Sequence, residues 1–202
     1  MANKDVEALI EESLTQSAQL KLRVARECSE AIAAAAQLIG DAFLNGGKLL
    51  LCGNGGSAAD AQHIAGEFIG RFRMERAALP ALALNVNTSV LTAIGNDYGF
   101  ERAFARQVEA MAVSGDVLIG ISTSGRSENV ALAMDAARRA GCRTIALVGQ
   151  TLGRVGQDAD VAISIPSSDT PRIQESHITV AHVICELVEK RVVAELSKGT
   201  AR

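Results

Sequence analysis

The sequence predicts a doubly wound α/β fold, in which a five-stranded parallel sheet is covered by helices on both faces. After residue 48, five short apolar runs alternate with stretches of helical character. The runs are continuously apolar rather than alternating with polar residues, which is typical of parallel strands buried on both faces. The predicted strands span residues 49–52, 81–84, 117–121, 144–148 and 161–165.

The helices are predicted from apolar residues that recur at intervals of three and four. Residues 5–45 predict one or two long helices, and shorter helical stretches follow near 57–72, 88–112, 127–140 and 152–158. A last helix, from about Arg172 to Leu196, is apolar over more than half of its circumference, whereas a surface helix needs only one apolar stripe. We expect this helix to lie in the core or against another copy of the chain, and we favour oligomerisation. The whole chain, 1–202, is predicted to form one domain that includes 1–45 as an N-terminal helical extension.

The composition excludes several classes of protein. Of the 202 residues, 48% are hydrophobic and 21% are charged, which is typical of a folded chain. The formal net charge of -3 and the aromatic content of 3% argue against nucleic-acid binding. No apolar stretch approaches the roughly 18–20 residues that cross a bilayer, and the N-terminus is polar where a signal peptide becomes apolar. We therefore expect a cytoplasmic protein that does not contact membranes and that binds a small molecule.

Two predicted strands end in loops rich in small polar residues. The first loop, Gly53–Ser57, has three glycines that let the backbone approach a ligand, and Ser57 can cap the following helix. The second loop, Ser122–Ser127, holds four hydroxyl side chains suited to phosphate oxygens. Because ligands of parallel sheets bind at the carboxyl ends of strands, the two loops together predict a phosphate site. Ala58 stands where a dinucleotide fingerprint needs its third glycine, so a nucleotide site is disfavoured.

Histidine and carboxylate side chains form a second group of candidates. His63 and Glu67 are four residues apart, so they share one face of the helix that follows the first loop. The last predicted helix contributes Gln174 and His182, and the four side chains would make a set of nitrogen and oxygen ligands that suits zinc. The alternative is structural: His63 and Glu67 form a surface hydrogen bond, and His182 is a core residue.

Five segments together resemble the phosphoheptose isomerases, which are sugar isomerase (SIS) domain proteins. The resemblance covers nearly the whole chain, and the combination of the first loop with the Arg-Ile-Gln-Glu-x-His segment is specific to this branch. The segments are Leu51–Ser57, Ala61–His63, Gly95–Asp97, Gly120–Ser127 and Arg172–His177.

This resemblance implies an aldose-ketose isomerase that converts sedoheptulose 7-phosphate to D-glycero-D-manno-heptose 7-phosphate, the first step toward the nucleotide-activated heptoses of bacterial surface glycans. Family members are typically homotetramers that often bind zinc. The resemblance assigns Glu67 as the base and His182 as the acid, and it makes His63, Glu67, Gln174 and His182 the metal ligands. The implied phosphate contacts are Ser57, Ser122, Thr123, Ser124 and Ser127, and the other implied substrate contacts are Asn54, Gly55, Asn96, Asp97 and Gln174.

One relative of these isomerases gives a different function. The DnaA initiator-associating protein uses the same fold as a tetrameric, non-catalytic module that binds the replication initiator DnaA, and it resembles this chain around residues 84–94. Glu67 and Gly56 argue against that alternative, since the adaptor lacks the carboxylate and has Thr in place of the glycine. A second departure concerns Pro171, where some isomerases have Asp, so a sugar contact from that carboxylate must come from Thr170, Asp169 or nothing.

Overall fold

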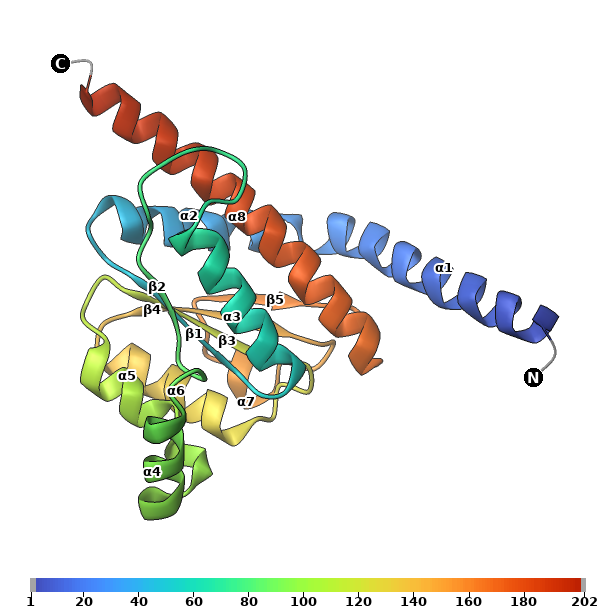
Figure 1. The fold of residues 1–202 in the computed structure, drawn as a ribbon, viewed down its shortest axis with the longest axis horizontal. Helices are drawn as coiled ribbons and strands as arrows, with labels where there is room; N and C mark the ends of the chain where they lie inside the picture. Colours follow the sequence, from blue (N-terminus) through green and yellow to red (C-terminus); the bar gives the residue numbers. More distant parts are fainter. Residues whose placement is uncertain (1–2, 201–202) are drawn as a thin grey trace.

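The computed structural model describes residues 3–200 and contains one five-stranded sheet surrounded by helices (Figure 1). The strands are β1 (Leu49–Gly53), β2 (Ala81–Ala83), β3 (Val117–Ser122), β4 (Arg143–Val148) and β5 (Val161–Ser164). The helices are α1 (Asn3–Glu27), α2 (Ser29–Leu44), α3 (Gly56–Ile69), α4 (Thr88–Tyr98), the 3₁₀ turn η1 (Phe100–Arg102), α5 (Ala105–Met111), α6 (Glu128–Arg139), α7 (Gly153–Gly156) and α8 (Thr170–Thr200).

The sheet is parallel throughout, in the order β2-β1-β3-β4-β5, and it confirms the predicted fold class. β1 and β3 are neighbours in the sheet although β2 lies between them in the sequence. At their carboxyl ends Gly53 pairs with Ile121. This is the topological switch point of a doubly wound sheet, where ligands of such folds bind.

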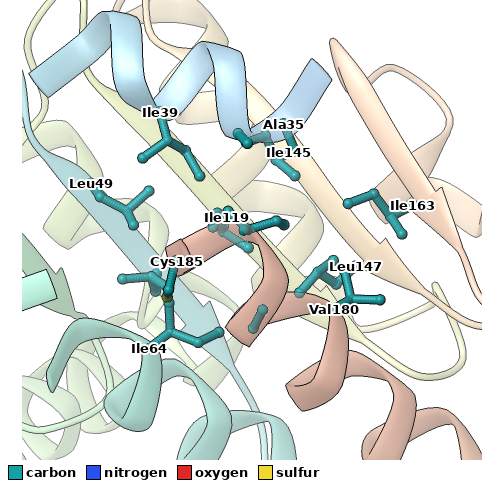
Figure 2. Packing of buried hydrophobic residues seen from close by; sticks show 14 of the residues in the cluster. Ala35, Ile39, Leu49, Ile64, Ile119, Ile145, Leu147, Ile163, Val180 and Cys185 are labelled. Atoms are coloured by element: carbon teal, nitrogen blue, oxygen red, sulfur yellow. The ribbon is translucent and has the colours of Figure 1, made fainter. Parts of the chain in front are cut away.

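Each face of the sheet packs against its own layer of helices. Alternate residues of the strands point to opposite faces, so neighbours such as Leu50 and Leu51 belong to different clusters of buried side chains. On one face the sheet packs against α1, α2, α3 and α8, and on the other it packs against α5, α6 and α7 (Figure 1). Figure 2 shows the first cluster, in which α2, α3 and α8 contribute Ala35, Ile39, Ile64, Val180 and Cys185.

Two predicted segments differ from the structure. The helical stretch predicted for residues 88–112 is divided into α4, η1 and α5, because Gly99 has a positive φ of 86° that an α-helix cannot accommodate. The second strand is shorter than predicted, and Leu82 at its centre is 37% exposed. β2 is the edge strand, so its outer face lacks the helical cover that makes the inner strands continuously buried.

The terminal helices extend beyond the sheet. α8 starts at Thr170, two residues before the predicted start, and packs one face against α2 and α3, while Val183 and Leu187 remain exposed. α1 projects from the body, and only its carboxyl-terminal part packs on the core, through Leu20 and Val24 (Figure 1). Among residues 3–200, no helix combines the length and the apolar character that a membrane span requires.

Candidate active site

The two polar loops predicted from the sequence lie side by side at the switch point, because β1 and β3 end next to each other. A pair of amide hydrogen bonds joins the first loop to the start of α6, the helix that follows the second loop. Asn54 donates to Asn129 at 2.8 Å, and Asn129 donates back to Asn54 at 2.9 Å. Asn129 also accepts a bond from the backbone N–H of Val130 in the first turn of α6. The pair fixes the first loop against the start of α6.

The first loop is shaped by its glycines. Gly55 has a positive φ of 55° and precedes the first residue of α3. A side chain at Gly53 would meet the backbone of Ser57, since a β-carbon there would lie 2.7 Å from the Ser57 carbonyl oxygen. Ser57 is buried inside the first turn of α3 and is therefore not its cap, contrary to the sequence prediction. No side chain caps this helix start, so its first N–H groups are free for an anion.

The second loop presents its hydroxyls in a short, ordered turn. The hydroxyls of Ser122 and Ser127 lie 2.9 Å apart, and Ser124 accepts a hydrogen bond from the backbone N–H of Arg126 at 3.2 Å. Gly125 has a positive φ of 68°, and a β-carbon there would lie 2.5 Å from the Leu152 carbonyl oxygen. Ser127 precedes α6 and its side chain makes no capping hydrogen bond to that helix. Thr123 is half-buried beside it.

The predicted histidine and carboxylate side chains converge between α3 and α8. One ligand atom from each of His63, Glu67 and His182 lies within 4.8 Å of the others. The Nε2 atom of His63 is 3.0 Å from a carboxylate oxygen of Glu67 and 3.3 Å from Nε2 of His182. The cluster joins residues that are 119 positions apart in the sequence. His182 is therefore a member of a polar cluster and not a core residue.

The geometry of this cluster fits a metal ion such as zinc. A histidine nitrogen carries either one proton or one lone pair, so Nε2 of His63 cannot make linear hydrogen bonds to Glu67 and His182 at once. A cation among the three removes that conflict. Zinc–nitrogen bonds of about 2.0–2.1 Å place two nitrogen ligands of a tetrahedral ion about 3.3 Å apart. The two histidine nitrogens have this separation, 3.3 Å.

Gln174, predicted as a fourth ligand and a substrate contact, lies at the other end of α3. A β-carbon at Gly56 would lie 2.4 Å from the amide nitrogen of Gln174, so this side chain rests on the first residue of the helix. The cluster of His63 and His182 lies about two turns further along α3 and α8, roughly 10–12 Å of helical rise. The structure thus brings Gln174 to the polar loops rather than into contact with the cluster.

Four other residues of the motifs and segments considered in the sequence lie elsewhere. Asn96 and Asp97 are exposed on α4, and the amide of Asn96 donates a hydrogen bond to the carboxylate of Asp97 at 2.8 Å. Asp169, considered as a substitute for a missing carboxylate, is exposed next to the first turn of α8 and lies 3.9 Å from Arg172. His177 is fully buried, and its Nε2–H donates to the Val148 carbonyl. Burial lowers the pKa of His177 to about 4, so it is neutral.

Sequence reasoning missed two residues that border the site. Asn129 is the amide partner of Asn54, and its place two residues after Ser127, at a helix start, is the signal that could have found it. Phe72 lies in the loop after α3, with its ring centroid 5.5 Å from that of His182. No periodicity or motif marks Phe72 in the sequence, since its position depends on how the loop returns over α8.

The chain is similar to known proteins over most of its length. The family model of the SIS domain matches residues 14–149. The phosphoheptose isomerase of Citrifermentans bemidjiense is 60% identical over 166 residues, which cover 82% of this chain and 86% of that protein. The phosphoheptose isomerase of Trichlorobacter lovleyi is 52% identical over 185 residues, which cover 92% of this chain and 94% of that protein.

Solved structures agree with the sequence comparison. The phosphoheptose isomerase from Neisseria gonorrhoeae is 42% identical and superposes with a TM-score of 0.86, covering 92% of this chain and 99% of that one. The enzyme from Francisella tularensis is 37% identical with a TM-score of 0.88, covering 94% of this chain and 100% of that one. The chain therefore belongs to the phosphoheptose isomerase family of SIS-domain proteins and is, by family, a sugar-phosphate isomerase.

Proposed function

We propose that this protein converts sedoheptulose 7-phosphate to D-glycero-D-manno-heptose 7-phosphate, with Glu67 as the base and His182 as the acid. The observation that carries the proposal is the convergence of a carboxylate and two imidazoles between α3 and α8, on the helix that starts at the polar loops. An aldose-ketose exchange needs a base and a partner acid within reach of two adjacent carbons. The relatives named phosphoheptose isomerase support the substrate.

In this mechanism, Glu67 takes a proton from C1 of the ketose, which leaves an enediolate across C1 and C2. Glu67 then returns the proton to C2, while His182 moves a proton between the oxygens on C1 and C2. The double bond to oxygen passes from C2 to C1, so the ketose becomes an aldose with no net gain or loss of electrons. No redox or nucleotide cofactor is required.

The polar loops would hold the phosphate. Ser57, Ser122, Thr123, Ser124 and Ser127 supply the hydroxyls, and the uncapped starts of α3 and α6 supply backbone N–H groups. Asn54, Gly55 and Gln174 lie at the same loops, where they would contact the sugar. Because the cluster lies about two turns along α3 from these loops, roughly 10–12 Å of helical rise, an extended seven-carbon chain can bridge them with its reacting end at Glu67.

A divalent ion, which we propose to be zinc, would be held by His63, Glu67 and His182. Gln174, which the resemblance makes a fourth ligand, rests against Gly56 about two helical turns away and stays a proposed sugar contact. When bound, such an ion would polarise the sugar oxygens and offset the negative charge that develops during the reaction. The same residues still provide the proton transfers and the orientation of the sugar. The ion would share Glu67 and His182 with the reacting end of the sugar, whereas the phosphate contacts come from other residues.

We also propose a cytoplasmic homotetramer in which neighbouring subunits complete the sites. The support is that apolar side chains of α1 are exposed in the single chain, among them Leu9, Ile10 and Leu14. Asn96 and Asp97 are also exposed and bond only to each other in the described hydrogen bonds, so a partner subunit can use them as substrate contacts.

The adaptor alternative, binding of DnaA without catalysis, is less well supported. Both residues that argue against it, Glu67 and Gly56, lie where α3 meets α8. A threonine at Gly56 would displace the amide of Gln174, since a β-carbon there already approaches it to 2.4 Å. The glycine therefore lets the Gln174 side chain rest on the first residue of α3, and a threonine there would move that side chain away.

Purified protein incubated with sedoheptulose 7-phosphate in deuterated water tests the proposal. We expect an aldose 7-phosphate to form and deuterium to enter at C2, because Glu67 exchanges its proton with solvent between the two transfers. Sedoheptulose without phosphate is the control and should react far more slowly, since it cannot use the polar loops. No product and no deuterium exchange from the phosphorylated sugar would contradict the proposed function.

A further inference from the structure

A buried ion pair joins the loop after α3 to α8. The guanidinium of Arg76 lies 3.1 Å from the carboxylate of Glu189, and the two side chains are 3% and 1% exposed. Most of the ion pairs in the described chain are on the surface, where such pairs contribute little. A fully buried pair has a large desolvation cost and therefore needs many compensating hydrogen bonds.

Glu189 has those hydrogen bonds. One carboxylate oxygen accepts from the backbone N–H of Phe72 at 3.0 Å and from Arg76, and the other accepts from Arg73 at 2.8 Å and Met74 at 2.9 Å. Burial raises the pKa of Glu189, but these N–H donors and the charge of Arg76 outweigh it and hold the pKa below its usual value. The loop after α3 is thus wrapped around one ionised carboxylate of α8.

Arg76 connects the same carboxylate to the end of α3. Its guanidinium donates to the backbone carbonyls of Glu67 at 2.9 Å and Phe68 at 2.8 Å. The last carbonyls of a helix have no partner within it, so Arg76 completes the end of α3 and places a cation where the helix dipole favours one. One of the two carbonyls belongs to the residue that we propose as the base.

The ion pair reaches the other half of the cluster as well. Glu189 lies about two turns after His182 on α8, on the same side of the helix. The ring of Phe72, whose backbone Glu189 holds, lies against the ring of His182 with centroids 5.5 Å apart. Arg76 therefore contacts the backbone of Glu67 on α3. Glu189 holds the backbone of Phe72, whose ring packs against His182 on α8.

We propose that Arg76 and Glu189 are positioning residues for the reaction. They set the position of the carboxyl-terminal end of α3 relative to α8. In this way they hold Glu67 and His63 at the distance from His182 that metal binding and proton transfer require. This inference rests on the proposed function for its activity readout. A shift of the carboxyl-terminal end of α3, where Arg76 binds, would separate the 3.3 Å contact between the histidines. The start of α3 would stay with the polar loops, because the hydrogen bonds between Asn54 and Asn129 hold the first loop there.

The variant Glu189→Gln tests the proposal. Glutamine has the same size, but its NH₂ group cannot accept the N–H bonds of the loop, and it leaves Arg76 without its counter-charge. We expect the dissociation constant for zinc alone to rise about 10–100-fold, as for other residues that orient metal ligands. Turnover should fall about 10-fold or more, while KM for the sugar phosphate changes less than about threefold, because the phosphate loops are intact.

Asp116→Asn is the matched control. Asp116 is 1% exposed in its side chain and pairs with Lys48 at 2.6 Å, and it accepts backbone bonds from Lys48 and Val113. It lies at the amino end of β3, opposite to the site. Its loss should lower the melting temperature as Glu189→Gln does, with zinc affinity and turnover within about twofold of wild type.

Three outcomes decide the matter. The protein has 3 histidines, so the ring NMR signals of His63 and His182 report their geometry even without zinc or turnover. The proposal is supported if Glu189→Gln, but not Asp116→Asn, alters the ring signals and weakens zinc binding. This result would stand even if the wild-type protein did not isomerise the heptulose and the proposed function were wrong. If only the melting temperature changes, as in Asp116→Asn, the pair is structural and the proposal is overturned. Where Glu189→Gln does not fold, Arg76→Lys, which keeps the charge but loses the carbonyl bonds, should give the same pattern.

Discussion

At the scale of single residues, the three histidines show how burial divides one residue type into different roles. His63 is exposed and His182 is half-buried, and they face each other across two helices. His177, five positions before His182 on the same helix, is fully buried and bonds to a strand carbonyl. His63 and His182 are placed where they could hold a metal ion, whereas the buried His177 is held neutral.

Glu67→Gln should reduce turnover by about 10²–10⁴-fold, because the amide keeps the size of the side chain but cannot take a proton from carbon. The melting temperature should change little, since Glu67 lies at the edge of the cluster. His182→Asn should show a similar loss of turnover together with a lower zinc content. Isomerase rate, zinc content and melting temperature measured on both variants check this, and near-wild-type turnover of Glu67→Gln would refute its role as the base.

His177 should make the protein sensitive to acid. Its pKa is lowered by burial from 6.5 to about 4, so below pH 6.5 the unfolded chain binds a proton that the folded chain does not. The free energy of unfolding should therefore decrease as the pH falls from 6.5 toward 4, by about 3 kcal/mol at most. Urea titrations at several pH values should show this decrease in wild type and lose it in His177→Gln. Equal pH dependence in the two proteins would contradict the prediction.

At the scale of elements, the sequence was sufficient for the strands and for the two loops that end them. Continuous apolar runs are strong signals of buried strands. Because the sheet is parallel, the loops that follow β1 and β3 lie at the same end of the sheet. The loop that brings Phe72 to His182 could not be predicted, because it depends on contacts between segments distant in the sequence, which local propensity does not record. The break at Gly99 has a local signal, the glycine itself, which the helical pattern over 88–112 outweighed.

The cluster was predicted only as a set of residues. The spacing of His63 and Glu67 places them on one face of a helix, but nothing local determines which turn of α8 meets that face. The structure places His182 there and Gln174 about two turns away, against Gly56. The alignment of α3 along α8 is a property of packing and of the Arg76–Glu189 pair, so it escapes a sequence pattern.

The second polar loop should bind phosphate through its hydroxyls. Ser124→Ala removes an exposed hydroxyl, and a hydrogen bond to a charged group contributes about 1.5–3 kcal/mol. We expect KM for the sugar phosphate to rise about 10-fold or more with little change in melting temperature. Ser167→Ala is the control, because Ser167 makes the same kind of turn bond, to the backbone N–H of Asp169 at 3.1 Å, outside this loop. Equal KM values for the two variants would argue against the phosphate assignment.

At the scale of the whole molecule, the single chain leaves apolar side chains exposed on its surface. α1 projects from the body with Leu9, Ile10 and Leu14 between 53% and 66% exposed. An apolar groove of about 350 Å³ also runs between α1, α2 and α8, lined by Val24, Ile32 and Val183 among others. Apolar surface of this extent is typical of a chain that associates with copies of itself.

We expect a homotetramer with a mass of four times 21.1 kDa in light scattering. Leu14→Asp should shift the mass toward smaller species. Leu14 is 66% exposed in the single chain, so a charge at this position is unfavourable only when another subunit buries it. Thr15→Asp on the neighbouring face of α1 is the control. A wild-type mass near 21.1 kDa at micromolar concentration would exclude the assembly.

The cluster joins positions 63 and 182, and α8 is translated after every strand of the sheet. During synthesis the earlier elements can fold first, but His63 and Glu67 then have no partner across from them. If the cluster binds a metal ion as proposed, a nascent chain would lack the complete site. Metal binding would then stabilise only the chain in which α8 has docked, and so it would favour finished molecules over unfinished ones.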